Sequence, residues 1–135
     1  MSFLLDTNLV AELRKPRAHP GVMRWFDSVD GSELFLSVLV LGEVRQGIVR
    51  LRRRDPRQAA TYDAWLSRLR HDFADRILPV TEDIALDWGR LNAGDPLPVV
   101  DGLLAATARV HNLTLVTRNV ADFERTEVPL LNPFV

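Results

Sequence analysis

Four acidic residues follow separate apolar segments of the sequence. They are Asp6 in FLLDTN, Glu43 in SVLVLGEV, Asp101 in LPVVDGLL and Asp122 in VTRNVADF. In an open parallel α/β sheet, carboxylates that follow different strands converge in the crevice at the carboxyl ends of the strands. Carboxylates about 5 Å apart repel by roughly 3 kcal/mol per pair at an effective dielectric constant of about 20. Such a cluster therefore calls for a cation, and oxygen ligands suit Mg²⁺ or Mn²⁺ better than Zn²⁺.

Short apolar runs of the kind found in buried parallel strands recur along the chain. They are FLL before Asp6, LFLSV at 34–38, ILPV at 77–80, LTLVT at 113–117 and PLL near the end. Helical patterns with one apolar stripe lie between them, at 39–54, 62–73 and 84–91 and after Asp101. This alternation predicts one α/β domain over residues 1–135, built on a parallel sheet.

Composition narrows the class of protein. The 135 residues are enough for one domain with its own core. Cysteine is absent, which excludes disulfides, thiolate metal sites and cysteine nucleophiles. The apolar stretch at the N-terminus is too short for a secretory signal or a membrane span. We therefore expect a cytoplasmic protein with no membrane partner.

Each of the four acids also has an ordinary structural explanation. Asp6 and Asp101 could each cap the helix that follows. Glu43 could lie on a solvated helix face, and Asp122 could cap a short turn around Phe123. Taken singly, none of these residues distinguishes structure from chemistry, so the argument rests on their joint arrangement.

The motifs form an ordered series: FLLDTN, a Ser-x5-Glu element from Ser37 to Glu43, VVDGLLAATA, LVTRNVADF and LLNPF. In this order they resemble the PIN-domain family over essentially the whole chain. More narrowly, the chain resembles the VapC-like ribonuclease toxins of type II toxin–antitoxin systems. The resemblance implies a three-layer α/β fold, in which a central five-stranded parallel sheet is flanked by helices and the acids gather at the strand ends.

The resemblance also implies roles for individual residues. By motif position, Asp6 and Asp101 are the principal metal ligands, while Glu43 and Asp122 complete the catalytic pocket, partly through water. Hydrogen bonds from supporting residues would orient ligands or water. The supporting residues are Asn8, Ser37, Thr117 and Asn119, and for Ser37 local cap bonding is the stronger alternative.

The implied activity is hydrolysis of RNA phosphodiester bonds by a toxin that inhibits translation or growth, with Mg²⁺ as cofactor and Mn²⁺ able to substitute. The implied partners are an RNA substrate, a cognate antitoxin and a second copy in a homodimer, with operator DNA reached only through the antitoxin. One alternative is a non-catalytic regulatory subunit acting in operator binding with its antitoxin. Another is a metal-dependent phosphatase, although the chain has no DxD pair after the first strand and no P-loop.

Arginines crowd one segment of a chain whose net charge is only −1; they are Arg45, Arg50, Arg52, Arg53, Arg54 and Arg57. We predict that Arg50, Arg52, Arg53 and Arg54 contact the RNA backbone without reading its sequence. The alternative is a solvated helix end, where arginines interact favourably with the helix dipole. The three histidines lack ligand spacing, and the three tryptophans are expected in the core or an interface.

Overall fold

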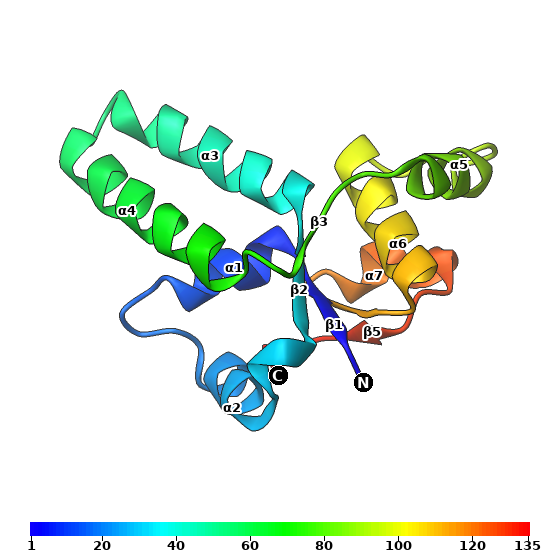
Figure 1. Cartoon of the computed structure of the whole chain (residues 1–135), viewed down its shortest axis with the longest axis horizontal. Helices are drawn as coiled ribbons and strands as arrows, with labels where there is room; N and C mark the ends of the chain where they lie inside the picture. Colours follow the sequence, from blue (N-terminus) through cyan, green and yellow to red (C-terminus); the bar gives the residue numbers. More distant parts are fainter.

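The computed structural model describes residues 1–135 and contains five parallel strands with helices on both sides of the sheet (Figure 1). The strands are β1 (Phe3–Leu5), β2 (Leu34–Ser37), β3 (Ile77–Leu78), β4 (Thr114–Val116) and β5 (Leu130–Leu131). Their order in the sheet is β3-β2-β1-β4-β5. The predicted fold class and all five predicted strands are confirmed, and the strands are shorter than the apolar runs that contain them.

Seven α-helices alternate with the strands. They are α1 (Thr7–Leu13), α2 (Pro20–Ser28), α3 (Val38–Arg52), α4 (Pro56–Asp72), α5 (Glu82–Leu91), α6 (Val99–His111) and α7 (Val120–Phe123), with short 3-10 turns at Gly31–Glu33 and Glu124–Thr126. The predicted apolar stripes lie on α3, α4 and α5. The helix α2 was not among the predicted helices. It is capped by His19, whose Nδ1 atom accepts a hydrogen bond from the Gly21 nitrogen at 3.0 Å.

β1 is the central strand and the most deeply buried part of the sheet. Leu4 and Leu5 are fully buried, and Leu4 pairs in register with Phe35 of β2 and Leu115 of β4. Complete burial of a leucine side chain contributes roughly 1.5–3 kcal/mol. The end of β1 is therefore held rigidly in the middle of the sheet edge, where Asp6 follows.

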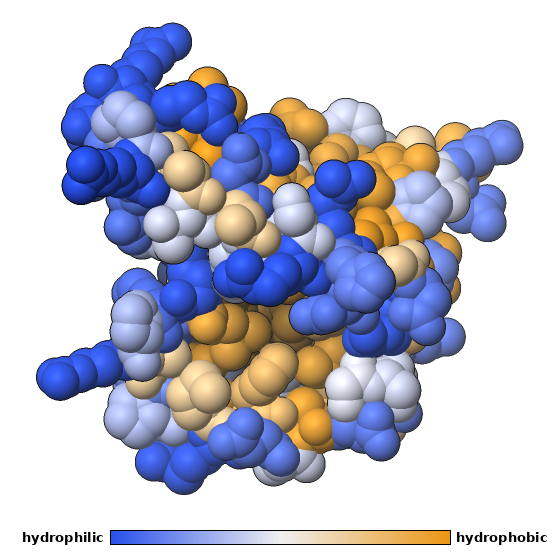
Figure 2. Space-filling model, turned by 60° about the vertical axis from the view of Figure 1, so that its left-hand side comes forward, coloured by the Kyte–Doolittle hydropathy of each residue, from blue (hydrophilic) through white to orange (hydrophobic).

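α3 and α4 form an antiparallel pair that projects from the sheet, called here the α3–α4 arm (Figure 1). Asp55 caps α4 by accepting a hydrogen bond from the Gln58 nitrogen at 3.1 Å. Asp63 of α4 pairs with Arg45 at 2.6 Å and with Arg52 at 3.3 Å, which ties the two helices together. Figure 2 shows hydrophilic side chains over the arm and apolar surface in the hollow below it. No helix has the length and apolar character that a membrane span requires.

Candidate active site

The carboxyl ends of the three central strands bring separate parts of the chain together. The Asp6 backbone nitrogen donates to the carbonyl of Val116 at 3.0 Å, which places Asp6 beside the end of β4. Thr117 follows Val116 and extends the pairing, because its nitrogen donates to the Leu131 carbonyl at 3.0 Å. The sheet itself thus sets Asp6 and Thr117 side by side.

Asp6 is 6% exposed and its carboxylate is held by three donors. Oδ1 accepts from the Thr7 nitrogen at 2.7 Å, while Oδ2 accepts from Thr117 Oγ1 at 2.8 Å and from Asn8 Nδ2 at 3.3 Å. Burial raises the pKa of Asp6, the hydrogen bonds oppose that rise, and the charge of Glu43 adds to it. Asp6 is also the N-cap of α1, so the capping explanation for Asp6 is correct and is compatible with a role in the acidic group.

Asp101 lies inside the first turn of α6, which begins at Val99 and has Pro98 at its N-cap position. The capping explanation for Asp101 is therefore wrong. Its carboxylate is half-buried. The pKa of Asp101 is raised first by burial and then by the charges of three other acids: Asp6, Glu43 and Asp122. The charges of all three residues thus act on Asp101.

Glu43 is half-buried on α3, and its Oε1 accepts a hydrogen bond from Thr7 Oγ1 at 2.5 Å. The explanation of Glu43 as a freely solvated helix residue is therefore wrong. Thr7 is a residue that the sequence analysis missed, although its place directly after a strand-end aspartate was a usable signal. Ser37 caps α3 through a 3.1 Å hydrogen bond from the Leu39 nitrogen, so it sets where the helix carrying Glu43 begins.

Thr117 is the centre of the supporting hydrogen bonds. Besides donating to Asp6, its hydroxyl accepts from Asn8 Nδ2 at 3.3 Å and from the Asn119 backbone nitrogen at 3.0 Å. Asn8 in turn accepts from the Arg118 nitrogen at 3.2 Å. Asn119 thus contributes its backbone, while Asn8 contributes both ends of its amide. This network fixes the orientation of the Asp6 carboxylate.

Asp122 lies on the short helix α7 and is exposed. Its backbone nitrogen donates to the Asn119 carbonyl at 3.0 Å, so the turn is closed by backbone groups rather than by the carboxylate. The charge of Asp122 contributes to the raised pKa of Asp101.

The acids are not packed into a ready-made set of three metal ligands. The four donors are all carboxylate oxygens, and Mg²⁺ takes one or two carboxylates directly while keeping several waters. The donor set therefore fits Mg²⁺ or Mn²⁺ bound partly through water. The histidines lie elsewhere: His19 caps α2, while His71 and His111 are exposed.

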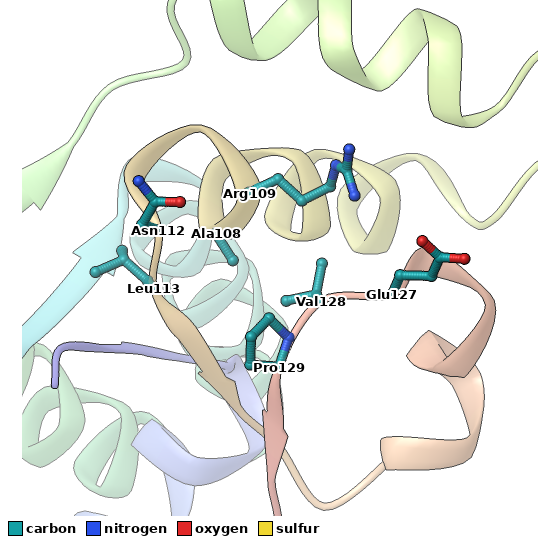
Figure 3. A pocket seen from close by; sticks show the side chains of 7 residues that line it. All are labelled: Ala108, Arg109, Asn112, Leu113, Glu127, Val128 and Pro129. Atoms are coloured by element: carbon teal, nitrogen blue, oxygen red, sulfur yellow. The ribbon is translucent and has the colours of Figure 1, made fainter.

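None of the cavities in the molecule is lined by the four acids. The largest, of about 450 Å³, lies at the opposite edge of the sheet, where Leu113 and Pro129 lead into β4 and β5 (Figure 3). Its Arg109 is already paired with Asp87 at 3.0 Å.

Comparison with known proteins agrees with this geometry, since the PIN domain family profile matches residues 3–129. The chain belongs to the PIN-domain family. The toxin FitB of Neisseria gonorrhoeae is 30% identical over 97% of each chain, and the VapC ribonuclease Y4jK of Sinorhizobium fredii is 30% identical over 97% of this chain and 96% of its own. In the structure of FitAB bound to an IR36 DNA fragment, the matching chain has a TM-score of 0.89 at 29% identity, covering 98% of this chain and 96% of the other. The predicted family is confirmed.

Proposed function

We propose that this PIN domain is a metal-dependent endoribonuclease and the toxin of a type II toxin–antitoxin system. The observation that supports the proposal is that Thr7 binds both Asp6 and Glu43 at the end of β1, while the charges of Asp6, Glu43 and Asp122 all act on Asp101. The relatives named above as a VapC ribonuclease and as a toxin support the same activity. The substrate is RNA, and the reaction is hydrolysis of a phosphodiester bond in the cytoplasm.

In this mechanism Asp6 and Asp101 would hold Mg²⁺, and Glu43 and Asp122 would bind it through water. The chemistry that Mg²⁺ would supply there is Lewis-acid stabilisation of the phosphoryl oxygens and a lower pKa of bound water. Thr117 keeps Oδ2 of Asp6 in one orientation. Glu43 uses Oε1 to accept from Thr7, which leaves Oε2 to accept a hydrogen bond from the attacking water. Three further residues support the site through hydrogen bonds: Asn8 donates to Asp6, the Asn119 nitrogen donates to Thr117, and Ser37 caps the helix that carries Glu43.

The basic end of the α3–α4 arm supplies backbone contacts to the RNA. Arg50, Arg52, Arg53 and Arg54 are all exposed there. Arg50 and Arg52 also lie in the last turn of α3, where their charges interact favourably with the helix dipole. The alternative explanation for these two arginines is therefore compatible with RNA contacts. Phosphate contacts of this kind position a strand without reading its sequence. Arg52 and Arg45 both form ion pairs with Asp63, so the guanidinium of Arg52 is held against α4.

Two protein partners belong to the proposal. The first is a cognate antitoxin, because the matching structural relatives are FitAB and FitAcB complexes, one of them bound to DNA. Operator DNA would then be reached through the antitoxin. The second is another copy of this chain. Leu86 of α5 and Val99 and Val110 of α6 are large apolar side chains exposed to solvent, and homodimerisation would cover them.

Cleavage of total cellular RNA by the purified protein tests the proposed activity. New ends are mapped by sequencing in Mg²⁺ or Mn²⁺, with EDTA and Asp101→Asn as controls. Asn preserves the shape of the side chain but removes a ligand charge, so we expect discrete ends that disappear in both controls. Cleavage that persists in Asp101→Asn, or folded protein that leaves RNA intact with metal present, would exclude this mechanism.

A further inference from the structure

A small cleft of about 240 Å³ lies between α1, α3 and α4. It is lined by Arg14, Gly47, Leu51, Arg54, Gln58 and Tyr62. Neither of its two arginines takes part in an ion pair. The cleft therefore carries positive charge that no side chain of the protein neutralises.

Arg14 is held in place by an aromatic ring, but its guanidinium makes no hydrogen bond within the protein. Its guanidinium lies 4.0 Å from the centre of the Tyr62 ring, which fixes the head group by a cation–π contact. The Nε atom is buried and has no hydrogen-bond partner. Leaving a buried donor unpaired costs about 1–3 kcal/mol. The terminal nitrogens of this fixed guanidinium are not buried and make no hydrogen bond within the protein, so they can donate to an acceptor in the cleft.

The cleft and the acidic residues lie along the same helices. α1 starts directly after Asp6 and ends at Leu13, with Arg14 at the C-cap, and Gly47 follows Glu43 by one turn of α3. With a rise of about 1.5 Å per residue, Gly47 is about 6 Å beyond Glu43 and Arg14 is about 12 Å beyond Asp6. A strand that leaves the acidic edge along this seam passes the cleft within a few nucleotides.

We propose that the cleft binds a backbone phosphate of the RNA strand, next to the phosphodiester that is hydrolysed. This inference rests on the proposed function. Arg14 and Arg54 supply N–H donors in the planar geometry that suits phosphate. Gln58 adds an amide donor, and nothing lies within 4 Å of the position that a Cβ of Gly47 would occupy, so the strand approaches α3 closely. The volume lies below the roughly 300–1,000 Å³ typical of small-molecule pockets and fits a single phosphate.

An acidic peptide is the other ligand with the right charge. Its carboxylates would also approach the four acids at the end of the seam, where like charges repel. An RNA strand avoids this conflict, because one phosphate meets the metal at the acidic residues while another meets the arginines. The same charge pattern therefore favours RNA over an acidic segment of a protein.

Salt-dependent binding of a short oligouridylate tests the proposal. Every protein carries Asp101→Asn, so the RNA is not consumed, and affinity is measured by fluorescence anisotropy in Mg²⁺ over a range of NaCl concentrations. Arg14→Gln and Arg54→Gln are compared with Arg68→Gln, which removes the same charge from an exposed position of α4 outside the cleft. We expect each cleft variant to bind about tenfold more weakly, since hydrogen bonds to charged groups are worth about 1.5–3 kcal/mol. The slope of log K against log salt should fall by about 0.7 for each lost contact, as for single strands.

Cleft variants that behave like Arg68→Gln would overturn the proposal. It would also be overturned if RNA binding stayed unchanged while binding of the antitoxin weakened, because the cleft would then belong to the protein partner. Thermal unfolding checks that each variant is folded. Arg54→Gln, at an exposed site, keeps the test valid if Arg14→Gln does not fold. Intact RNA in the Asp101→Asn background tests the nuclease separately, so either proposal can fail without the other.

Discussion

The hydroxyl of Thr7 donates a 2.5 Å hydrogen bond to Glu43 and so joins the first turn of α1 to the middle of α3. The backbone nitrogen of the same residue donates to Asp6 Oδ1 at 2.7 Å. One residue therefore restrains two carboxylates that repel each other. This arrangement predicts that Thr7 acts on the metal site without being a ligand.

Replacing Thr7 by Val removes the hydroxyl and keeps the β-branched shape. Loss of a hydrogen bond to a metal-ligating group typically lowers metal affinity or activity by about 10–100-fold. We expect a decrease of this size in Mn²⁺ affinity, measured by calorimetry, and in RNA cleavage. Thr61→Val on the exposed side of α4 is the matched control, because the Thr61 hydroxyl contacts only the Arg57 carbonyl at 3.2 Å. Equal metal affinity in the two variants would contradict the proposed role of Thr7.

The raised pKa values of Asp6 and Asp101 make the stability of the metal-free protein depend on pH. Both lie above the ordinary value of 3.8, so the folded state holds these protons more tightly than the unfolded state does. The contribution of these two groups to the free energy of unfolding should therefore decrease as pH rises from about 3.8 through their raised pKa values, with the full penalty present at neutral pH. Urea unfolding in EDTA across this range measures the effect.

Asp101→Asn isolates that contribution, because every other carboxylate is common to both proteins. Glu12, whose pKa is lowered chiefly by a hydrogen bond from Lys15, contributes in the opposite direction but equally to both. The variant should be more stable than the wild type at neutral pH, within the range of about 0.5–2 kcal/mol common for stabilising substitutions. A variant less stable than the wild type throughout would show that burial of the ionised Asp101 carboxylate, with the repulsion from its neighbours, does not destabilise the folded protein.

Adding metal should reverse the penalty at neutral pH. A ligand that binds only the folded state stabilises it by about 2.7 kcal/mol at a concentration of about 100 times its dissociation constant. We therefore expect Mg²⁺ or Mn²⁺ to raise the melting temperature of the wild type and to have much less effect on Asp6→Asn. Ca²⁺-free buffers with EDTA supply the baseline. Identical shifts in the two proteins would place the metal elsewhere.

Gly102 allows α5 and α6 to pack closely next to Asp101. A Cβ at this position would lie 2.8 Å from Asn92 Nδ2 and 3.0 Å from the Trp88 indole. Gly102→Ala should therefore destabilise the protein by about 1–3 kcal/mol, as overpacking does. Gly89→Ala on α5, where nothing lies within 4 Å, should instead stabilise it by roughly 0.5–1 kcal/mol through helix propensity. Chemical unfolding of both variants checks the predicted difference in sign.

The sheet could be predicted from sequence because buried parallel strands are read as continuous apolar runs. The same signal overestimates strand length, since Val38 already belongs to α3. It also does not show where a helix begins. Asp101 follows an apolar run just as Asp6 does, yet α6 starts two residues before Asp101 and α1 starts one residue after Asp6. Backbone geometry, rather than residue type, separates a capping carboxylate from one in the first turn.

Contacts between helices could not be predicted in this way. The bond from Thr7 to Glu43 spans 36 residues, and the contact between Arg14 and Tyr62 joins helices that are far apart in the chain. Each depends on how α1, α3 and α4 pack around the sheet. Charge clustering did indicate a basic arm, but it gave no reason to associate Arg14 with Arg54. The acidic residues and supporting residues such as Asn8 and Thr117 were predicted from sequence, whereas the bond that Thr7 makes to Glu43 required the structure.

The central position of β1 has a consequence for how the protein is made. β1 is the first strand to leave the ribosome, but its neighbour β4 begins only at Thr114, and Asp122 comes later still. At a synthesis rate of about 5–20 residues per second, the four acids cannot meet until nearly the whole polypeptide has emerged. A nascent or prematurely terminated chain has no assembled acidic site. If the protein is the nuclease proposed above, it would thus stay inactive while a messenger RNA is still directing its synthesis.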